Sequence, residues 1–394
     1  MNTGLRHYLT ITFGYWAFTI TDGAIRMLVV LHFHELGYQP LEIAMLFLFY
    51  EFFGVVTNLV GGWLGARIGL NATMHIGMGL QIVALGMLGV DASWLTVPYV
   101  MAAQALSGIA KDLNKMSAKA SVKLMVAEGS DSTLFRWVAV LTGSKNSLKG
   151  AGFFTGAALL AWVGFDGAVL GMAAVLAVVL IVTWVLLPGD LGKTKSKPKF
   201  TQIFAKDPAV NWLSAARFFL FGARDVWFVV GLPVFLSAVL GWSYMQVGGF
   251  LALWIIGYGV IQASAPTLIR RGNPDGASAT TLAFALAASP ALIALAIHRG
   301  LDPTWVLIVG LTLFGILFAL NSAVHSYLIV AWSDREKVSM NVGFYYMANA
   351  GGRLAGTVLS GWVYQQHGLV GCLLYSTLFV VLAATLSLKL PRTA

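Results

Sequence analysis

The chain has 394 residues, of which 58% are hydrophobic and only 10% are charged, and its formal net charge is +9. About a quarter of the residues in a soluble domain are charged, so this composition excludes an ordinary soluble protein and indicates a polytopic membrane protein. The basic residues are spread over short loops and apolar segments, which argues against nucleic acid as a partner.

Apolar runs of about 20 residues recur along the whole chain, which is the length a helix needs to cross a bilayer. A barrel would show alternating segments of roughly ten residues, so we predict an all-α protein. The first run contains Asp22 and Arg26 and is too long for a signal-peptide core, so it counts as a membrane helix. Twelve spans are predicted, at residues 8–34, 41–66, 71–92, 94–122, 134–163, 165–187, 209–239, 243–269, 277–298, 302–331, 339–365 and 368–390.

One long polar stretch, residues 188–208, divides these spans into six and six. We predict an N-terminal six-helix half at 1–187, a cytoplasmic linker at 188–208 and a C-terminal six-helix half at 209–394. The halves resemble each other: LGYQPLEI from Leu36 matches LGWSYMQV from Leu240, and KGAG at Lys149 matches RLAG at Arg353. A duplication with its site between the halves is therefore expected.

The basic residues also predict the orientation. With a cytoplasmic amino terminus, the basic loop residues from Arg6 to Arg392 fall inside and only Arg299 falls outside. We therefore expect a multi-pass protein of the lipid bilayer with both termini in the cytoplasm.

Two consecutive spans carry charges deep inside, where each costs about 3 kcal/mol or more unless it meets partners or water. Positions at helical spacing share a face, and the polar ones are Lys111, Asn114, Lys115 and Lys119 in one span and Lys145 and Lys149 in the next. Two adjacent helices are thus predicted to present ammonium groups to one interior space. Alternatively, Asp112 pairs with Lys111 or Lys115 as a brace, and the lower lysines reach for the headgroups.

Over all spans, cations outnumber acids by eight to four. The cations are Arg26, Lys111, Lys115, Lys145, Lys149, Arg217, Arg224 and Arg353, and the acids are Asp22, Glu51, Asp112 and Asp225. A surplus of about four positive charges is hard to maintain at low dielectric unless an anion or water lies between the helices. The sign of the surplus predicts a small anionic substrate.

Depth narrows the candidates for substrate binding. Five cations fall near mid-membrane, where transporter sites lie, and they are Arg26, Lys145, Lys149, Arg224 and Arg353. Guanidinium matches the oxygens of a phosphate or carboxylate, and lysine adds point charge. Alternatively, Arg26 pairs with Asp22 four residues back, and Arg224 pairs with an acid on a neighbouring helix. Arg217 lies nearer the cytoplasm, as a funnel or a headgroup anchor.

Other polar residues have two readings each. Asn114 and Asn321, at equivalent places in the two halves, could hydrogen-bond substrate oxygens or join packed helices, as could His325. Glu51 is the preferred proton-coupling candidate. The other three are Asp22, Asp112 and Asp225. A structural carboxylate bound to a partner helix is the alternative, and for Glu51 it is the favoured one. The single Cys372 excludes a multi-thiolate metal site, and no cofactor is expected.

The six-plus-six spans and the sequence GGWLGARIG after the second span resemble the major facilitator superfamily. More closely, YWAFTITDGAIRMLVVLHFHELGY, FLFYEFFGVVTNLVGGWL, QALSGIAKDLNKMSAKA, LTGSKNSLKG and NWLSAARFFLFGARDVWFVVGLPVF resemble the ArsJ-type organoarsenical efflux permeases of that superfamily. The resemblance implies export of 1-arseno-3-phosphoglycerate from a bacterium across its inner membrane. It also implies a functional link to a glyceraldehyde-3-phosphate dehydrogenase, which makes that ester from arsenate. Some organophosphate antiporters of the superfamily hold phosphate with one arginine from helix one and one from helix seven, where Arg26 and Arg224 fall.

Two other functions compete with this one. An exchanger of ordinary organophosphates for inorganic phosphate fits the same charges. A membrane enzyme acting on lipid headgroups fits poorly, because no polar loop brings a nucleophile and a base together. Direct arsenite export is disfavoured, since trivalent arsenic prefers thiolates and only Cys372 is present.

Overall fold

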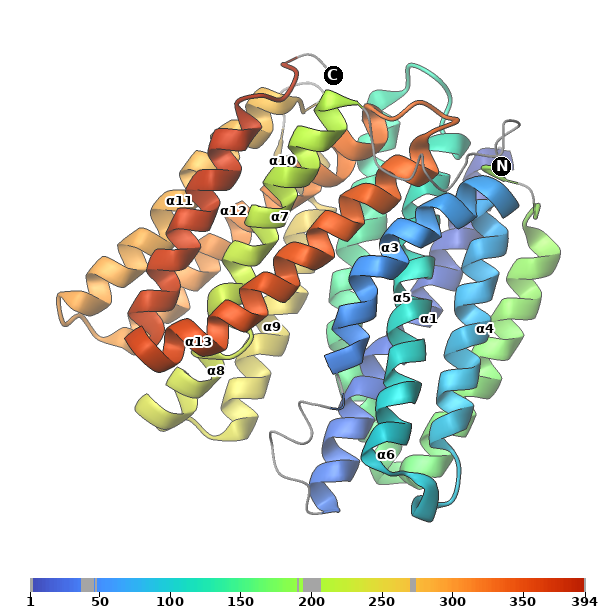
Figure 1. Cartoon of the computed structure of the whole chain (residues 1–394), viewed down its shortest axis with the longest axis horizontal. Helices are drawn as coiled ribbons and strands as arrows, with labels where there is room; N and C mark the ends of the chain where they lie inside the picture. The colour runs from blue at the N-terminus through green and yellow to red at the C-terminus, as the bar shows by residue number, and fades with distance from the viewer. Residues whose placement is uncertain are drawn as a thin grey trace. The chain divides into compact units, whose positions relative to one another are not determined.

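The computed structural model describes residues 3–36, 46, 48–189, 191–193, 207–269 and 274–392, and these residues form helices joined by short turns, with no strand among them (Figure 1). Most of the predicted linker, 188–208, lies outside the described residues. The first half contains α1 (Thr3–Glu35), α3 (Leu48–Ile68), α4 (Leu70–Leu88), the short η1 (Ala92–Trp94), α5 (Val97–Met125) and α6 (Asp131–Leu186). The second half contains α7 (Pro208–Phe228), α8 (Gly231–Val234), the π-helical η3 (Phe235–Val239), α9 (Tyr244–Ala263), α10 (Ala265–Leu268), α11 (Gly276–His298), α12 (Pro303–Ala331) and α13 (Val338–Ser387).

Local sequence explains where several helices begin. Ser243 accepts a hydrogen bond from the amide of Gln246, whose side chain returns one to the amide of Ser243, so α9 starts with a capping box. Asp207 and Asp302 accept from the second amide beyond them, and each is followed by a proline at the first helical position. These side chains satisfy amide groups that a helix end would otherwise leave without acceptors.

Two of the longest helices, α6 and α13, each supply two membrane spans. Their backbone breaks at Gly164, where φ is 72°, and at Gly368, where φ is 61°, and glycine adopts such angles at little cost. Eight helices of the described chain are long and apolar enough to cross a membrane, and α6 and α13 are among them. The shorter apolar part of α3 and the lysine-rich α5 complete the twelve predicted spans. The all-α, twelve-span fold expected from the sequence is therefore confirmed.

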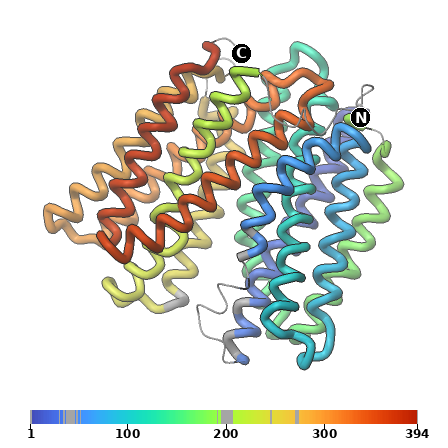
Figure 2. Tube along the Cα trace, in the orientation of Figure 1, coloured from blue at the N-terminus to red at the C-terminus, as the bar shows by residue number. Residues whose placement is uncertain are grey.

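The chain forms two compact units. Unit 1 comprises Met1–Ser130, Ser144–Phe204 and Ser333–Met347, and unit 2 comprises Asp131–Gly143, Ala205–Trp332 and Ala348–Ala394. Each unit includes a short piece of a long helix that otherwise belongs to the other unit. In unit 1, α5 packs against α1, α3 and α4, and in unit 2, α12 packs against α7, α9 and α11. The trace of each bundle can be followed by colour in Figure 2.

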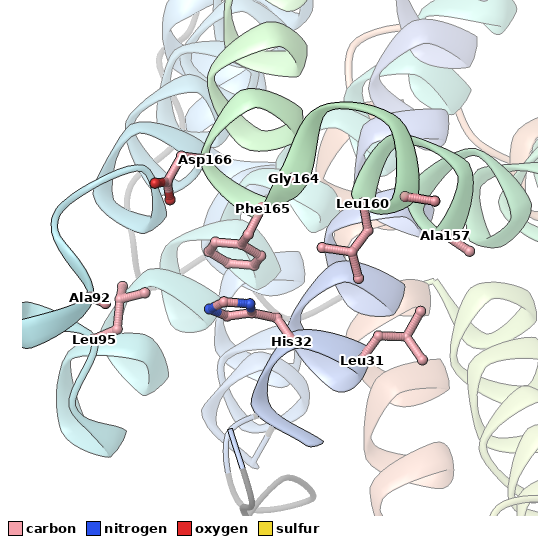
Figure 3. Close-up of a pocket in the computed structure, with 10 residues that line it drawn as sticks. Leu31, His32, Ala92, Leu95, Ala157, Leu160, Gly164, Phe165 and Asp166 are labelled. Atoms are coloured by element: carbon pink, nitrogen blue, oxygen red, sulfur yellow. The ribbon is translucent and has the colours of Figure 1, made fainter. Parts of the chain in front are cut away.

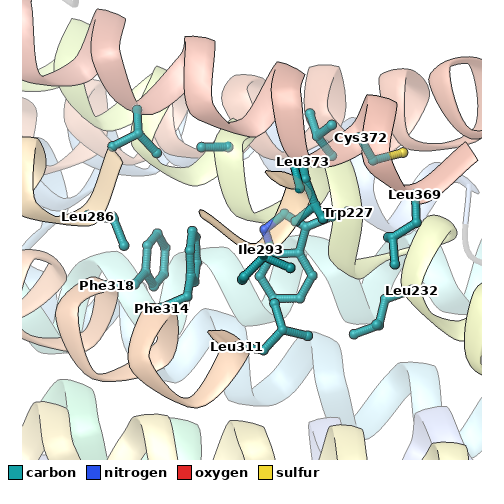
Figure 4. Packing of buried hydrophobic residues seen from close by; sticks show 14 of the residues in the cluster. Trp227, Leu232, Leu286, Ile293, Leu311, Phe314, Phe318, Leu369, Cys372 and Leu373 are labelled. Carbon is teal, nitrogen blue, oxygen red and sulfur yellow. The ribbon is translucent and has the colours of Figure 1, made fainter. Parts of the chain in front are cut away.

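Each unit has its own apolar core. In unit 2, the ring of Trp227 is 1% exposed and meets Phe314 edge to face, with ring centroids 5.1 Å apart. Leu286, Leu311 and Leu369 belong to the same cluster of buried side chains, as Figure 4 shows. Buried aromatic pairs of this geometry stabilise a core beyond their buried area. These cores fix the helices that carry the buried charges.

Candidate functional site

An ion pair between two helices lies at the centre of unit 1. Asp22 of α1 accepts from the ammonium group of Lys149 on α6, with Oδ2 and Nζ 3.2 Å apart. The hydroxyl of Tyr50 on α3 donates to the other carboxylate oxygen, Oδ1. The carboxylate is almost fully buried, so both interactions offset its cost in low dielectric. One acid thus joins three helices.

The ring of Tyr50 carries two further cations. The guanidinium of Arg26 lies 4.1 Å from the ring centroid and the ammonium of Lys111 lies 3.8 Å from it. Each gains from the negative potential over the aromatic face. Tyr50 therefore organises both the acid and two predicted site cations.

A second tyrosine, Tyr346, also contacts two cations with its ring, and both of these cations belong to α5. Lys115 and Lys119 lie over the ring of Tyr346, at 4.4 and 5.4 Å from its centroid. Asp112 pairs with Lys115 at 2.5 Å and lies 3.7 Å from the ammonium of Lys111. The alternative that Asp112 braces the lysines of its own helix is thus the arrangement seen. Tyr346 belongs to the part of α13 that packs in unit 1.

Lys145 is surrounded by other cations. It lies within electrostatic range of Lys115, Lys149 and Lys111, and Asp22 is the one acid in that range among the described residues. No described carboxylate comes within ion-pair distance of Lys145. The other three lysines lie close to Asp22 or Asp112, so the repulsion that an entering anion would relieve acts mainly on Lys145.

Unit 2 contains a matching acid between two cations. Asp225 on α7 accepts from Arg224 at 2.5 Å and, through its other oxygen, from Arg353 on α13 at 3.1 Å. The acid predicted for Arg224 on a neighbouring helix is in fact the next residue of its own helix. Asp225 and Arg353 hold the places in the second half that Asp22 and Lys149 hold in the first, in keeping with the match of RLAG to KGAG.

Glycines let the paired helices approach closely. A Cβ atom at Gly23 would lie 2.7 Å from the carbonyl oxygen of Lys149 and 3.1 Å from the Cα atom of Gly152. In unit 2, a Cβ atom at Gly356 would lie 2.6 Å from the carbonyl oxygen of Gly222. Small residues at such crossings bring backbones together in membrane bundles. The ion pairs therefore span unusually tight crossings.

Replacing Gly152 by alanine is expected to lower the free energy of unfolding by about 1–3 kcal/mol, because the new methyl group overlaps the backbone of α1. The matched control is Gly171→Ala in the same helix, where nothing lies within 4 Å of the added Cβ. Since alanine favours a helix over glycine, this control is expected to leave stability unchanged or raised. Thermal unfolding in detergent measures both. Equal midpoints for the two variants would contradict the tight crossing.

Arg217 is held inside unit 2. Only 2% exposed, it donates from Nε to the side-chain oxygen of Asn349 at 2.9 Å and from Nη1 to the hydroxyl of Ser322 at 3.1 Å. Tyr258 and Gln262 donate to the same hydroxyl. The sequence suggested a funnel or a headgroup anchor, whereas the structure has Arg217 bracing α7, α12 and α13.

The remaining predicted residues are placed as follows. Asn114 donates to the carbonyl oxygen of Met74 at 3.1 Å, which joins α5 to α4. Asn321 and His325 are buried on α12, and the polar atoms of both side chains have no hydrogen-bond partner among the described residues. Glu51 belongs to α3, but its side chain lies outside what the structure describes. No group of three or more metal-ligating side chains occurs in the described chain.

Unit 1 also has an apolar cavity of about 510 Å³. In this cavity the ring of His32 stacks on that of Phe165, with ring centroids 4.1 Å apart. Leu31, Leu95 and Leu160 lie around the two rings, as Figure 3 shows. Among the described residues of its lining, Asp166 is the only acid, and none of the predicted substrate-binding cations takes part. The cavity is therefore separate from the predicted substrate-binding cations of unit 1, which are Arg26, Lys111, Lys115, Lys145 and Lys149.

A helical membrane bundle with charged groups buried in both of its units is typical of a membrane transporter. A family model described as the Major Facilitator Superfamily matches residues 11–298. The chain therefore belongs to the major facilitator superfamily, whose members are transporters and not enzymes. No curated protein matches the sequence significantly.

Solved structures share the fold at low sequence identity. The human organic anion transporter MFSD10 (TETRAN) is 16% identical, with a TM-score of 0.78 over 98% of this chain and 100% of that one. A bacterial homologue of the iron transporter ferroportin, in an outward-facing state, is 15% identical with a TM-score of 0.77 over 99% of both chains. The E. coli fucose:proton symporter FucP is 12% identical with a TM-score of 0.74 over 98% of both. These likenesses concern the fold alone.

Proposed function

We propose that this transporter carries a small phosphorylated organic anion, and that the anion is 1-arseno-3-phosphoglycerate. The observation that carries the first part is Lys145, which lies within electrostatic range of three other lysines and has no carboxylate at ion-pair distance among the described residues. An anion that enters this space relieves their repulsion and is therefore bound. The human organic anion transporter with the same fold carries cargo of the same sign.

The choice of substrate rests on the chemistry of the cluster and on the sequence resemblance. Ammonium and guanidinium groups suit the oxygens of a phosphate, an arsenate ester and a hydroxyl, all of which this molecule carries. Trivalent arsenic would need thiolates, but Cys372 is single and buried. Export across a bacterial inner membrane, with both termini in the cytoplasm, and supply by a glyceraldehyde-3-phosphate dehydrogenase are parts of the same proposal.

The test is uptake of arsenic into inside-out membrane vesicles. The vesicles receive glyceraldehyde 3-phosphate, NAD, arsenate and active dehydrogenase, with vesicles lacking the transporter as the control. We expect arsenic to accumulate only when the dehydrogenase is active, because only then is the ester made. Accumulation of 3-phosphoglycerate in phosphate-loaded vesicles without arsenate would instead identify an organophosphate exchanger. No accumulation of either anion would contradict the proposal.

A further inference from the structure

The acid and the cation of each buried pair differ in exposure. The side chain of Asp22 is 3% exposed, whereas that of its partner Lys149 is 21% exposed. The side chain of Asp225 is 1% exposed, whereas that of its partner Arg353 is 32% exposed. The carboxylate is thus buried among the packed helices, while part of the surface of the cation stays accessible. An anion that enters from outside would therefore meet the cation of the pair before the acid.

Asp22 interacts with three cations, whose total positive charge is larger than the single negative charge of its carboxylate. Besides Lys149, it lies within electrostatic range of Lys111 and Arg26. Both of these cations rest on the ring of Tyr50, whose hydroxyl holds the carboxylate. The acid, the ring and the three cations form one group contributed by four helices. Tyr50 contacts the acid and two of the three cations, Arg26 and Lys111. Lys149 reaches Asp22 from α6 with part of its surface accessible, so it is the cation that can most easily leave Asp22 for a bound anion.

A carboxylate and a phosphate present similar oxygens to these donors. We propose that Asp22 is an internal counter-anion: it occupies the cations of unit 1 when no substrate is bound, and the substrate's anionic group displaces it from Lys149. Tyr50 is the positioning residue that holds Asp22 for this exchange. This inference rests on the proposed anionic substrate. Asp225 with Arg353 in unit 2 repeats the arrangement in the other half of the chain.

The consequence is a competition that can be measured. Each anion that binds must first break the pair of Asp22 with Lys149, so removing the charge of Asp22 removes an internal competitor. We expect Asp22→Asn to bind 3-phosphoglycerate about tenfold more tightly than the wild type in detergent. Tyr50→Phe keeps the ring under both cations but loses the hydroxyl, and it is expected to tighten binding by a smaller factor. The matched control is Asp334→Asn, which removes the same charge from an exposed pair with Lys337.

Titration calorimetry and anion-dependent thermal unfolding are the two readouts. Because ligand binding raises the unfolding midpoint, 3-phosphoglycerate should stabilise Asp22→Asn more than it stabilises the wild type. A merely structural role for Asp22 would lower the midpoint equally with and without the anion. If Asp22→Asn does not yield folded protein, Tyr50→Phe decides the question alone.

The outcomes separate this inference from the proposed function. Binding by the wild type with no tightening in Asp22→Asn or Tyr50→Phe would overturn the internal counter-anion and leave the anion transporter intact. Binding by Asp22→Asn alone would support the inference, because the wild-type carboxylate then outcompetes the probe. Absence of binding in every variant, together with absence of vesicle uptake, would overturn both.

Discussion

Lys145→Ala is expected to abolish most of the arsenic uptake by inside-out vesicles, with binding of 3-phosphoglycerate weakened about 10- to 100-fold. A hydrogen bond to a charged group contributes about 1.5–3 kcal/mol, which corresponds to that range of affinity. Lys145 lies within electrostatic range of Lys115 and Lys149 and has no acid at ion-pair distance in the described chain, so no carboxylate competes there with an entering anion. Its loss should therefore cost more binding energy than loss of a paired cation.

Two controls accompany this variant. Lys145→Arg keeps the positive charge and is expected to retain much of the binding. Lys337→Ala removes the same charge from an exposed lysine that pairs with Asp334 at 3.5 Å, and uptake should not change. Unchanged binding by Lys145→Ala would show that the anion lies elsewhere and would remove the observation on which the proposed function depends.

Asp225→Asn is expected to give the largest loss of stability, about 3–5 kcal/mol, because it leaves Arg224 and Arg353 without their buried acid. Thermal unfolding in detergent, without added anion, measures the change. The double variant Asp225→Asn with Arg353→Met should recover part of the loss, since one of the two uncompensated charges is removed as well. A double-mutant cycle of these substitutions then gives the coupling between the two residues.

Asp334→Asn is the control that tests whether removing any negative charge from the protein lowers its stability. Asp334 is exposed and its pair with Lys337 is worth little, so its loss should leave the unfolding midpoint unchanged. If Asp225→Asn unfolds at the same midpoint as the wild type, the two arginines are compensated by something other than Asp225, and its equivalence to Asp22 is lost.

The helices followed from the sequence to within a few residues. The predicted spans 134–163 and 165–187 meet where α6 breaks at Gly164, and the predicted start at 368 is the glycine at which α13 breaks. Most of the first seven residues of the predicted span 41–66 lie outside the described residues. The helix that corresponds to this span, α3, starts at Leu48. Apolar length, turn residues and helical spacing are local properties, so a sequence states them directly.

The partners of the buried charges could not be predicted in the same way. Asp22 had Arg26 as its candidate partner on the same helix, yet Lys149 of α6 and Tyr50 of α3 hold it in the structure. Tyr50 lies in a run of aromatic residues with no periodic polar pattern, so it was not predicted as a residue of the site. The one available signal was its position: it precedes Glu51 in a span that must pack beside the lysine-rich one.

The sequence by itself determined the class of this protein, an all-α membrane protein with twelve helices, and it predicted a duplicated chain and a surplus of buried positive charge. The tertiary structure alone decided which charges meet, with Asp22 on Lys149, Arg26 and Lys111 on Tyr50, and Arg217 on Asn349. The physical reason is that helix formation and membrane insertion depend on residues within a few turns. Ion pairing depends on the rotation and crossing of helices that are far apart in the chain, which glycine contacts such as Gly23 with Gly152 set.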